Sequence, residues 1–172
     1  MQKTLILLSA LALTAATGFA EDGSSVGEEV RVAPKARLSA GVGYGGPLGA
    51  SVAGEVVYGL GADVRDDGDR VKAVAGILFQ VEGGSGGGKL SLGIGARAHV
   101  ESEGFKAPAG VGVKLSLART WAEAGVDEGR TLLGPEIDLS AKHVGVTLGV
   151  LFRVGGAPGQ TAVFSWGLGL RL

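Results

Sequence analysis

The sequence predicts an all-β protein, an eight-stranded antiparallel up-and-down β-barrel that crosses a membrane. From Ala36 to Leu172, apolar residues alternate with small or polar ones, and a period of two is that of a β-strand. Turn-rich stretches divide this region into eight segments in sequence order. Glycine supplies 33 of the 172 residues without a collagen-like repeat, which suits the crowded interior of a narrow barrel.

The N-terminal residues predict export. Lys3 precedes an apolar run from Leu5 to Ala16, and the small residues Gly18 and Ala20 flank Phe19. This is the pattern of a signal peptide over residues 1–20, cleaved after Ala20. The apolar run is shorter than the ~20 residues that a membrane-spanning helix needs. Residues 21–35 are polar and predict a mobile leader, so the barrel is expected to occupy residues 36–172.

The first four segments place apolar residues at every second position over most of their length. These positions run from 38 to 44, from 48 to 64, from 71 to 81 and from 90 to 100. The intervening positions hold mainly glycine, serine and charged residues. The stretches "GGP", "RDDGDR" and "EGGSGGGK" separate the segments and predict turns.

The last four segments repeat the alternation at positions 111 to 117, 133 to 139, 144 to 152 and 164 to 172. Pro135 predicts a local irregularity in the sixth segment. The connections "ESEGFKAP", "AEAGVDEGR" and "VGGAPGQ" contain glycine or proline, whereas the connection around Ala141 and Lys142 contains neither. Short links between consecutive segments predict antiparallel neighbours throughout.

The composition of the two faces predicts that the apolar face is outside. A soluble barrel would carry lysine, glutamate and threonine on its exterior, but the polar face here is mostly glycine and serine in mid-strand. The apolar face is almost free of charge, and a charge facing lipid at the bilayer midplane costs about 2 to 4 kcal/mol. Arg119 is the exception, and it falls at a strand end, where that cost fades.

Charged residues on the polar face predict a ladder of ion pairs inside the barrel. Counting across the turns places Arg37 opposite Glu55, Asp63 opposite Lys72 and Glu82 opposite Lys89. Lys114 comes level with Glu136 or Asp138, depending on the register of the longer fifth connection. Such pairs are expected to plug the barrel. The full predicted ladder is Arg37, Glu55, Asp63, Lys72, Glu82, Lys89, Arg97, His99, Lys114, Glu136, Asp138, Arg153 and Arg171.

Six aromatic residues predict a rim at one end of the barrel. Four fall late in odd-numbered segments or just after them, and two fall early in the last segment, so all are expected at the same end. Aromatic rings favour the headgroup level of a bilayer, which indicates a membrane girdle, although Tyr58 falls elsewhere. The rim residues are Tyr44, Phe79, Trp121, Phe152, Phe164 and Trp166.

The final segment carries the pattern on which a family resemblance rests. Ser165, Gly167, Leu170 and Leu172 follow the order polar, glycine, bulky, bulky, with the last two separated by one residue. With the signal peptide and eight segments, the region 36–172 resembles the small eight-stranded outer-membrane barrels of the OmpA and OmpX type. The resemblance implies that these four residues are an insertion signal read by the outer-membrane assembly machinery. Leucine stands at the last position, where that family usually has an aromatic residue.

The sequence offers no convincing chemical site. The absence of cysteine excludes disulfides and thiolate catalysis, and a net charge of −1 offers no basic patch for nucleic acid. His99 and Ser102 point to opposite faces of a strand, and His99 and His143 lack a third metal ligand. "EGGSGGGK" lacks the ending of a phosphate-binding loop, and "DVRDDGDR" lacks the spacing of a calcium loop.

These observations predict a monomeric, non-enzymatic structural or surface protein of the bacterial outer membrane, with the bilayer and the assembly machinery as partners and no cofactor. Short connections argue against a receptor or adhesin, which would display long loops. Three alternatives stay open: a narrow porin-like conductance path, a soluble secreted barrel that binds an apolar ligand, and a lipid-modifying enzyme of the outer membrane.

Overall fold

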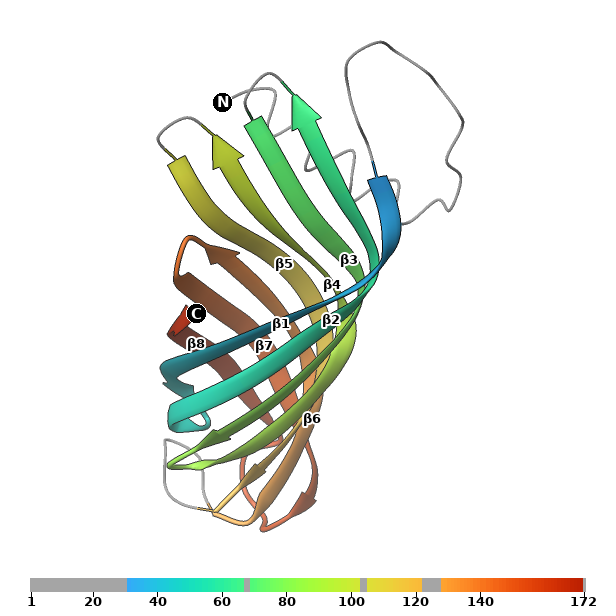
Figure 1. Cartoon of the computed structure of the whole chain (residues 1–172). Coiled ribbons are helices and arrows are strands. Elements are labelled where there is room, and N and C mark those ends of the chain that lie inside the picture. Colours follow the sequence, from blue (N-terminus) through green and yellow to red (C-terminus); the bar gives the residue numbers. More distant parts are fainter. Residues whose placement is uncertain (1–30, 67–68, 103–104, 122–127, 172) are drawn as a thin grey trace.

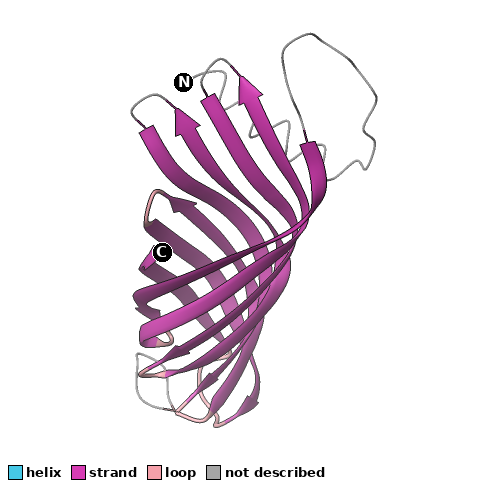
Figure 2. Cartoon of the chain, in the orientation of Figure 1, coloured by secondary structure: helices cyan, strands magenta, loops and turns pink. Residues whose placement is uncertain are grey.

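The computed structural model describes residues 31–66, 69–102, 105–121 and 128–171, and within them the fold is a closed antiparallel β-barrel (Figures 1 and 2). Each strand pairs with the next in sequence, and β8 returns to pair with β1. This confirms the all-β, eight-stranded, up-and-down architecture. The strands are β1 (Arg31–Gly46), β2 (Gly49–Asp66), β3 (Asp69–Gly84), β4 (Gly87–Ser102), β5 (Phe105–Thr120), β6 (Arg130–Ala141), β7 (Val144–Gly156) and β8 (Ala162–Arg171).

The described residues contain no helix that is long and apolar enough to cross a membrane.

The barrel has two distinct ends. We call one end the aromatic end, because the predicted aromatic rim falls there. It carries the connections β1–β2, β3–β4, β5–β6 and β7–β8. We call the opposite end the terminal end, because β1 begins and β8 ends there. It carries the connections β2–β3, β4–β5 and β6–β7. Strands β2 to β5 are 16 to 18 residues long and rise beyond β6 to β8 at the terminal end (Figure 1). The ring is therefore taller on one side than on the other.

The register of the first hairpin differs from the predicted one by two residues. Arg37 lies opposite Val57, and Glu55 lies opposite Ser39, so the predicted Arg37–Glu55 pairing is wrong. The prediction took residues 45–47 as the loop, but β2 begins only at Gly49, which has a positive φ of 70°. Leu48 is buried in the turn instead of starting the strand. A shift of two residues leaves the side chains of the paired strand residues on their predicted faces, and Leu48 is the exception.

The other predicted registers agree with the structure. Asp63 lies opposite Lys72, and Glu82 lies opposite Lys89. Of the two registers left open for Lys114, the structure has the one with Glu136 opposite.

Strand β1 begins at Arg31, five residues before the expected start of the barrel at Ala36. Residues 31–35 therefore belong to the sheet and pair with the far end of β2, from Gly59 to Asp63. Pro34 cannot donate a backbone hydrogen bond, which suits an edge position. In the described residues, this part of β1 has β2 as its only strand neighbour.

The outer face is apolar on all eight strands. Exposed residues include Leu92 on β4 and Leu168 on β8, at 60% and 57% of their full accessible area. The inner face holds the buried charges and, in addition, two apolar clusters that the sequence did not predict. Ala118, Leu132, Leu151 and Val163 form one cluster, and Val57, Val74 and Leu78 form the other. The barrel therefore has a packed interior.

Candidate functional site

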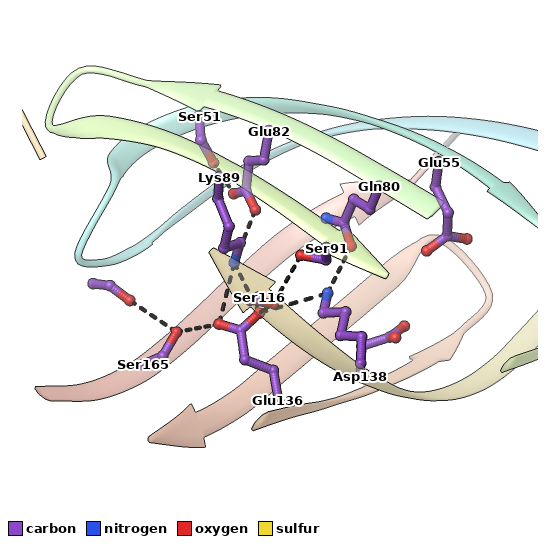
Figure 3. A network of polar contacts seen from close by, with 12 residues as sticks. Ser51, Glu55, Gln80, Glu82, Lys89, Ser91, Ser116, Glu136, Asp138 and Ser165 are labelled. Atoms are coloured by element: carbon purple, nitrogen blue, oxygen red, sulfur yellow. Dashed lines mark hydrogen bonds and ion pairs between the residues drawn. The ribbon is translucent and has the colours of Figure 1, made fainter. Parts of the chain in front are cut away.

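Apart from Arg130, the buried charges of the interior form two groups, and Glu136 is the centre of the first. The Nζ atom of Lys89 lies 3.1 Å from Glu82 Oε2 and 3.2 Å from Glu136 Oε2 (Figure 3). Lys114 Nζ lies 3.9 Å from Glu136 Oε2 and donates a hydrogen bond of 2.6 Å to Gln80 Oε1. These residues come from β3, β4, β5 and β6, so the group spans half of the ring.

Two serines complete the surroundings of Glu136. Ser116 Oγ donates to Glu136 Oε2 at 2.6 Å, and Ser165 Oγ donates to Glu136 Oε1 (Figure 3). Glu136 is 1% exposed, yet both of its carboxylate oxygens accept hydrogen bonds and it faces two lysines. Its burial is therefore compensated by charge and by hydrogen bonds.

Arg97 on β4 is the centre of the second group. Its Nη2 atom lies 2.6 Å from Glu55 Oε2, and its Nε atom donates to Glu55 Oε1 at 2.7 Å, which makes a bidentate pair. The same Nη2 atom lies 2.8 Å from Asp138 Oδ2. Arg171 on β8 reaches Asp138 Oδ2 at 2.8 Å and Glu55 Oε2 at 3.5 Å. Strands β2, β4, β6 and β8 are thus joined across the interior.

The two groups are electrically balanced. The first contains two carboxylates and two lysines, and the second contains two carboxylates and two arginines. A balanced set of this kind can keep charges buried at a tolerable cost, because each charge has an opposite partner within 3.9 Å. We refer to both groups together as the charge network. Its members are Glu55, Glu82, Lys89, Arg97, Lys114, Glu136, Asp138 and Arg171.

Inward glycines make room for these long side chains. A Cβ atom on Gly110 would lie 2.6 Å from Arg97 Cδ, and one on Gly112 would lie 2.6 Å from Asp138 Oδ1. A Cβ atom on Gly149 would lie 2.7 Å from Glu136 Cγ. Such distances are shorter than any real contact, so part of the glycine excess is explained by the space that the charge network needs.

Five members of the predicted ladder lie outside the charge network. Asp63 makes a bidentate pair with Arg70, at 2.6 and 2.9 Å, although Lys72 lies opposite it. His99 Nε2 lies 3.5 Å from Glu101 Oε1. Arg153 Nη1 donates to the Ala157 carbonyl at 3.1 Å, at the aromatic end.

Lys72 and Arg37 are half-buried near the terminal end, and Arg37 lines a cavity there. The predicted ladder therefore overestimates how many of these residues join one connected network of ion pairs.

Neutral partners in the interior were missed by the sequence interpretation. Gln80 accepts from Lys114, and the hydroxyls of Ser91 and Ser116 lie 2.8 Å apart. Arg70 was also missed as the partner of Asp63. All of them occupy inward positions of the alternation, so the face was predictable, but nothing in the sequence marks which of these residues contacts which charge.

The six predicted rim residues all have exposed side chains near the aromatic end. Trp121 directly follows β5, and Phe164 lies two residues into β8. Tyr44 and Trp166 come from paired strands, with ring centroids 6.1 Å apart in an edge-on arrangement. Phe79 and Phe152 lie further from the turns but on the same half of their strands.

The predicted insertion signal is split between the two faces of β8. Ser165 points inward and contacts Glu136, whereas Leu170 is exposed on the outer face. Gly167 lies between Gly45 of β1 and Thr147 of β7. Leu172 lies outside the described residues.

The described residues contain no group of three or more histidine, aspartate or glutamate side chains placed to hold a metal ion. A comparison of the chain with protein families, with curated proteins and with solved structures found no match.

Proposed function

We propose that this chain is a monomeric, non-enzymatic outer-membrane β-barrel with a structural or surface role and an interior closed by the charge network. The observation that carries the proposal is the outward apolar face of a closed ring. Exposed large apolar residues occur on every strand, and Leu38 is 79% exposed. In water this face would form an apolar surface far larger than soluble monomers tolerate, whereas lipid accommodates it.

The filled interior favours this function over two alternatives. A conductance path needs a continuous aqueous bore, but the charge network and the cluster around Leu132 and Leu151 occupy the interior. A soluble barrel that binds an apolar ligand needs an apolar pocket inside and a polar surface outside. Here the ion pairs are inside, and the apolar residues are outside.

The connections suggest an orientation in the membrane. The longest lie at the aromatic end, from Thr120 to Arg130 and from Gly156 to Ala162. Outer-membrane barrels have short turns at the periplasmic end and longer loops outside. We therefore assign the aromatic end to the cell exterior and the terminal end to the periplasm, with export and assembly following the predicted signals at the two ends of the chain.

Membrane fractionation tests the proposal. The full chain, expressed in a Gram-negative bacterium, is expected in the outer-membrane fraction and resistant to extraction with carbonate. On gels it is expected to migrate differently before and after heating, because a folded barrel resists detergent until it is boiled. Recovery in the soluble periplasmic fraction would contradict the proposal.

A further inference from the structure

A cavity at the terminal end of the barrel is lined by cationic side chains. It has a volume of about 280 Å³ and lies between β1, β4, β5, the β6–β7 turn and the end of β8. Its lining contains no carboxylate-bearing residue. Its basic lining residues are Arg37, Arg97, His99, Lys142, His143 and Arg171.

The cavity opens sideways past the edge of β1. Among the described residues, β1 pairs with β8 only from Gly41 to Gly46. The earlier residues of β1 pair with β2 alone. Arg37, Leu38 and Ser39 of β1 line the cavity, and the side chain of Leu38 is exposed on the outer face. Because this part of β1 has no strand neighbour among the described residues on the side of β8, the cavity lies beside an open strand edge. The cavity therefore communicates with the apolar outer surface.

The cavity keeps an excess of positive charge. Glu55 and Asp138 lie next to it, but Arg97 and Arg171 already bind both carboxylates. Arg37, in contrast, has no such partner. Within the part of the chain that the structure describes, it makes no hydrogen bond or ion pair. A half-buried guanidinium beside further cations provides a donor for an anion from outside.

We propose that this cavity binds a phosphate group, carried by a lipid headgroup or by a small phosphorylated solute. A guanidinium presents paired N–H donors that match phosphate oxygens. The volume is near the lower limit of roughly 300 Å³ for ligand sites, which suits a headgroup but excludes a whole lipid. A lipid would place its headgroup beside Arg37 and its chains along Leu38 and the outer face. Lipid as the source rests on the proposed membrane function, whereas phosphate binding does not.

Calorimetry on the refolded full chain in non-ionic detergent tests the site. The probes are dihexanoyl phosphatidic acid, inorganic phosphate and dihexanoylglycerol, which lacks the phosphate. We expect saturable binding of the phosphatidic acid and none of the dihexanoylglycerol. Arg37→Gln should weaken binding about tenfold or more, as expected for the loss of a charge-assisted hydrogen bond. Arg37→Lys should keep part of the affinity.

Arg119→Gln is the matched control, because Arg119 is an exposed arginine at the aromatic end that contacts Thr131. It should leave the affinity within about twofold of the unchanged protein. Heat-dependent gel migration verifies that each variant is folded, and Arg37→Gln leaves the charge network intact.

The outcomes separate the possible sources. Inorganic phosphate that binds as tightly as the phosphatidic acid identifies a phosphorylated solute, and much weaker binding identifies a lipid. The site would be overturned if the folded Arg37→Gln variant bound the phosphatidic acid as tightly as the unchanged protein does. It would also be overturned if dihexanoylglycerol bound as tightly as the phosphatidic acid. If the unchanged protein fractionates with the outer membrane but does not bind the phosphatidic acid or inorganic phosphate, this site is rejected and the proposed function is left intact.

Discussion

Glu136 is the residue on which the first group of the charge network depends. It faces Lys89 and Lys114 and accepts hydrogen bonds from Ser116 and Ser165. Glu136→Gln would keep the shape but leave the lysines short of one negative charge. The free energy of unfolding should fall by about 3 to 5 kcal/mol, measured by urea unfolding in lipid vesicles.

Glu128→Gln is the control for this experiment, because Glu128 is exposed near the start of β6. Its effect should stay within about 0.5 kcal/mol. A Glu136→Gln protein as stable as the control would show that the buried carboxylate is not charged in the folded barrel.

Glu55 provides a second test, because its partner in the structure differs from the predicted one. Glu55 binds Arg97 in a bidentate pair and is not opposite Arg37. A double-mutant cycle between Glu55→Gln and Arg97→Met should give a coupling of about 0.5 to 3 kcal/mol. The same cycle with Arg37→Met should give a clearly smaller value. Equal or stronger coupling to Arg37 would restore the predicted register.

The contrast between Glu55 and Asp63 shows what a sequence can predict at the residue scale. Alternation predicted the inward face of both, because a strand has a strict period of two. It did not predict their partners, since long arginines reach diagonal or distant neighbours across a narrow interior. Asp63 lies opposite Lys72 but pairs with Arg70, and Glu55 pairs with an arginine two strands away.

At the scale of the strands, inward glycines form a continuous row. Gly59, Gly76, Gly95 and Gly112 lie directly opposite one another on β2, β3, β4 and β5. A Cβ atom on Gly76 would collide with the carbonyl oxygen of Tyr58. Glycine inside a strand commonly marks a bend or a close approach. The row thus lets the four long strands curve around the interior (Figure 1).

Gly76→Ala should therefore destabilise the barrel, because the colliding atom belongs to the backbone and cannot move aside. We expect a loss of about 1 to 3 kcal/mol in urea unfolding. The matched control is Gly54→Ala on β2, where an added Cβ would meet nothing within 4 Å. The control should be neutral or slightly stabilising. Equal stability of the two variants would contradict the role of the glycine row.

The turns explain why two registers were predicted correctly and the register of the first hairpin was not. The pairings of Asp63 with Lys72 and of Glu82 with Lys89 follow from turns centred as the sequence suggested. In "GGPLG" the small residues do not mark where the next strand begins. The burial of Leu48 in the turn determines that β2 begins only after it. The inward Leu132 and Leu151 were missed for a related reason, since neighbouring apolar residues hide the alternation.

For the whole molecule, the filled interior predicts very low conductance. The purified protein in planar bilayers should carry little or no steady current, because the charge network and the cluster around Leu132 block the bore. Large, stable, salt-dependent channels would instead support a conductance path.

The central claim is that the apolar outer face contacts lipid, and the absence of cysteine allows a direct measurement. Spin labels are attached to Leu92→Cys and Ile94→Cys on the outer face of β4, and to Ser85→Cys in the β3–β4 connection. The labelled proteins are reconstituted in vesicles and probed with oxygen, which partitions into lipid, and with a water-soluble nickel chelate. We predict that the labels at 92 and 94 collide with oxygen far more often than with the chelate, and that the chelate has much better access to the label at 85. Chelate access at 92 and 94 equal to that at 85 would contradict it.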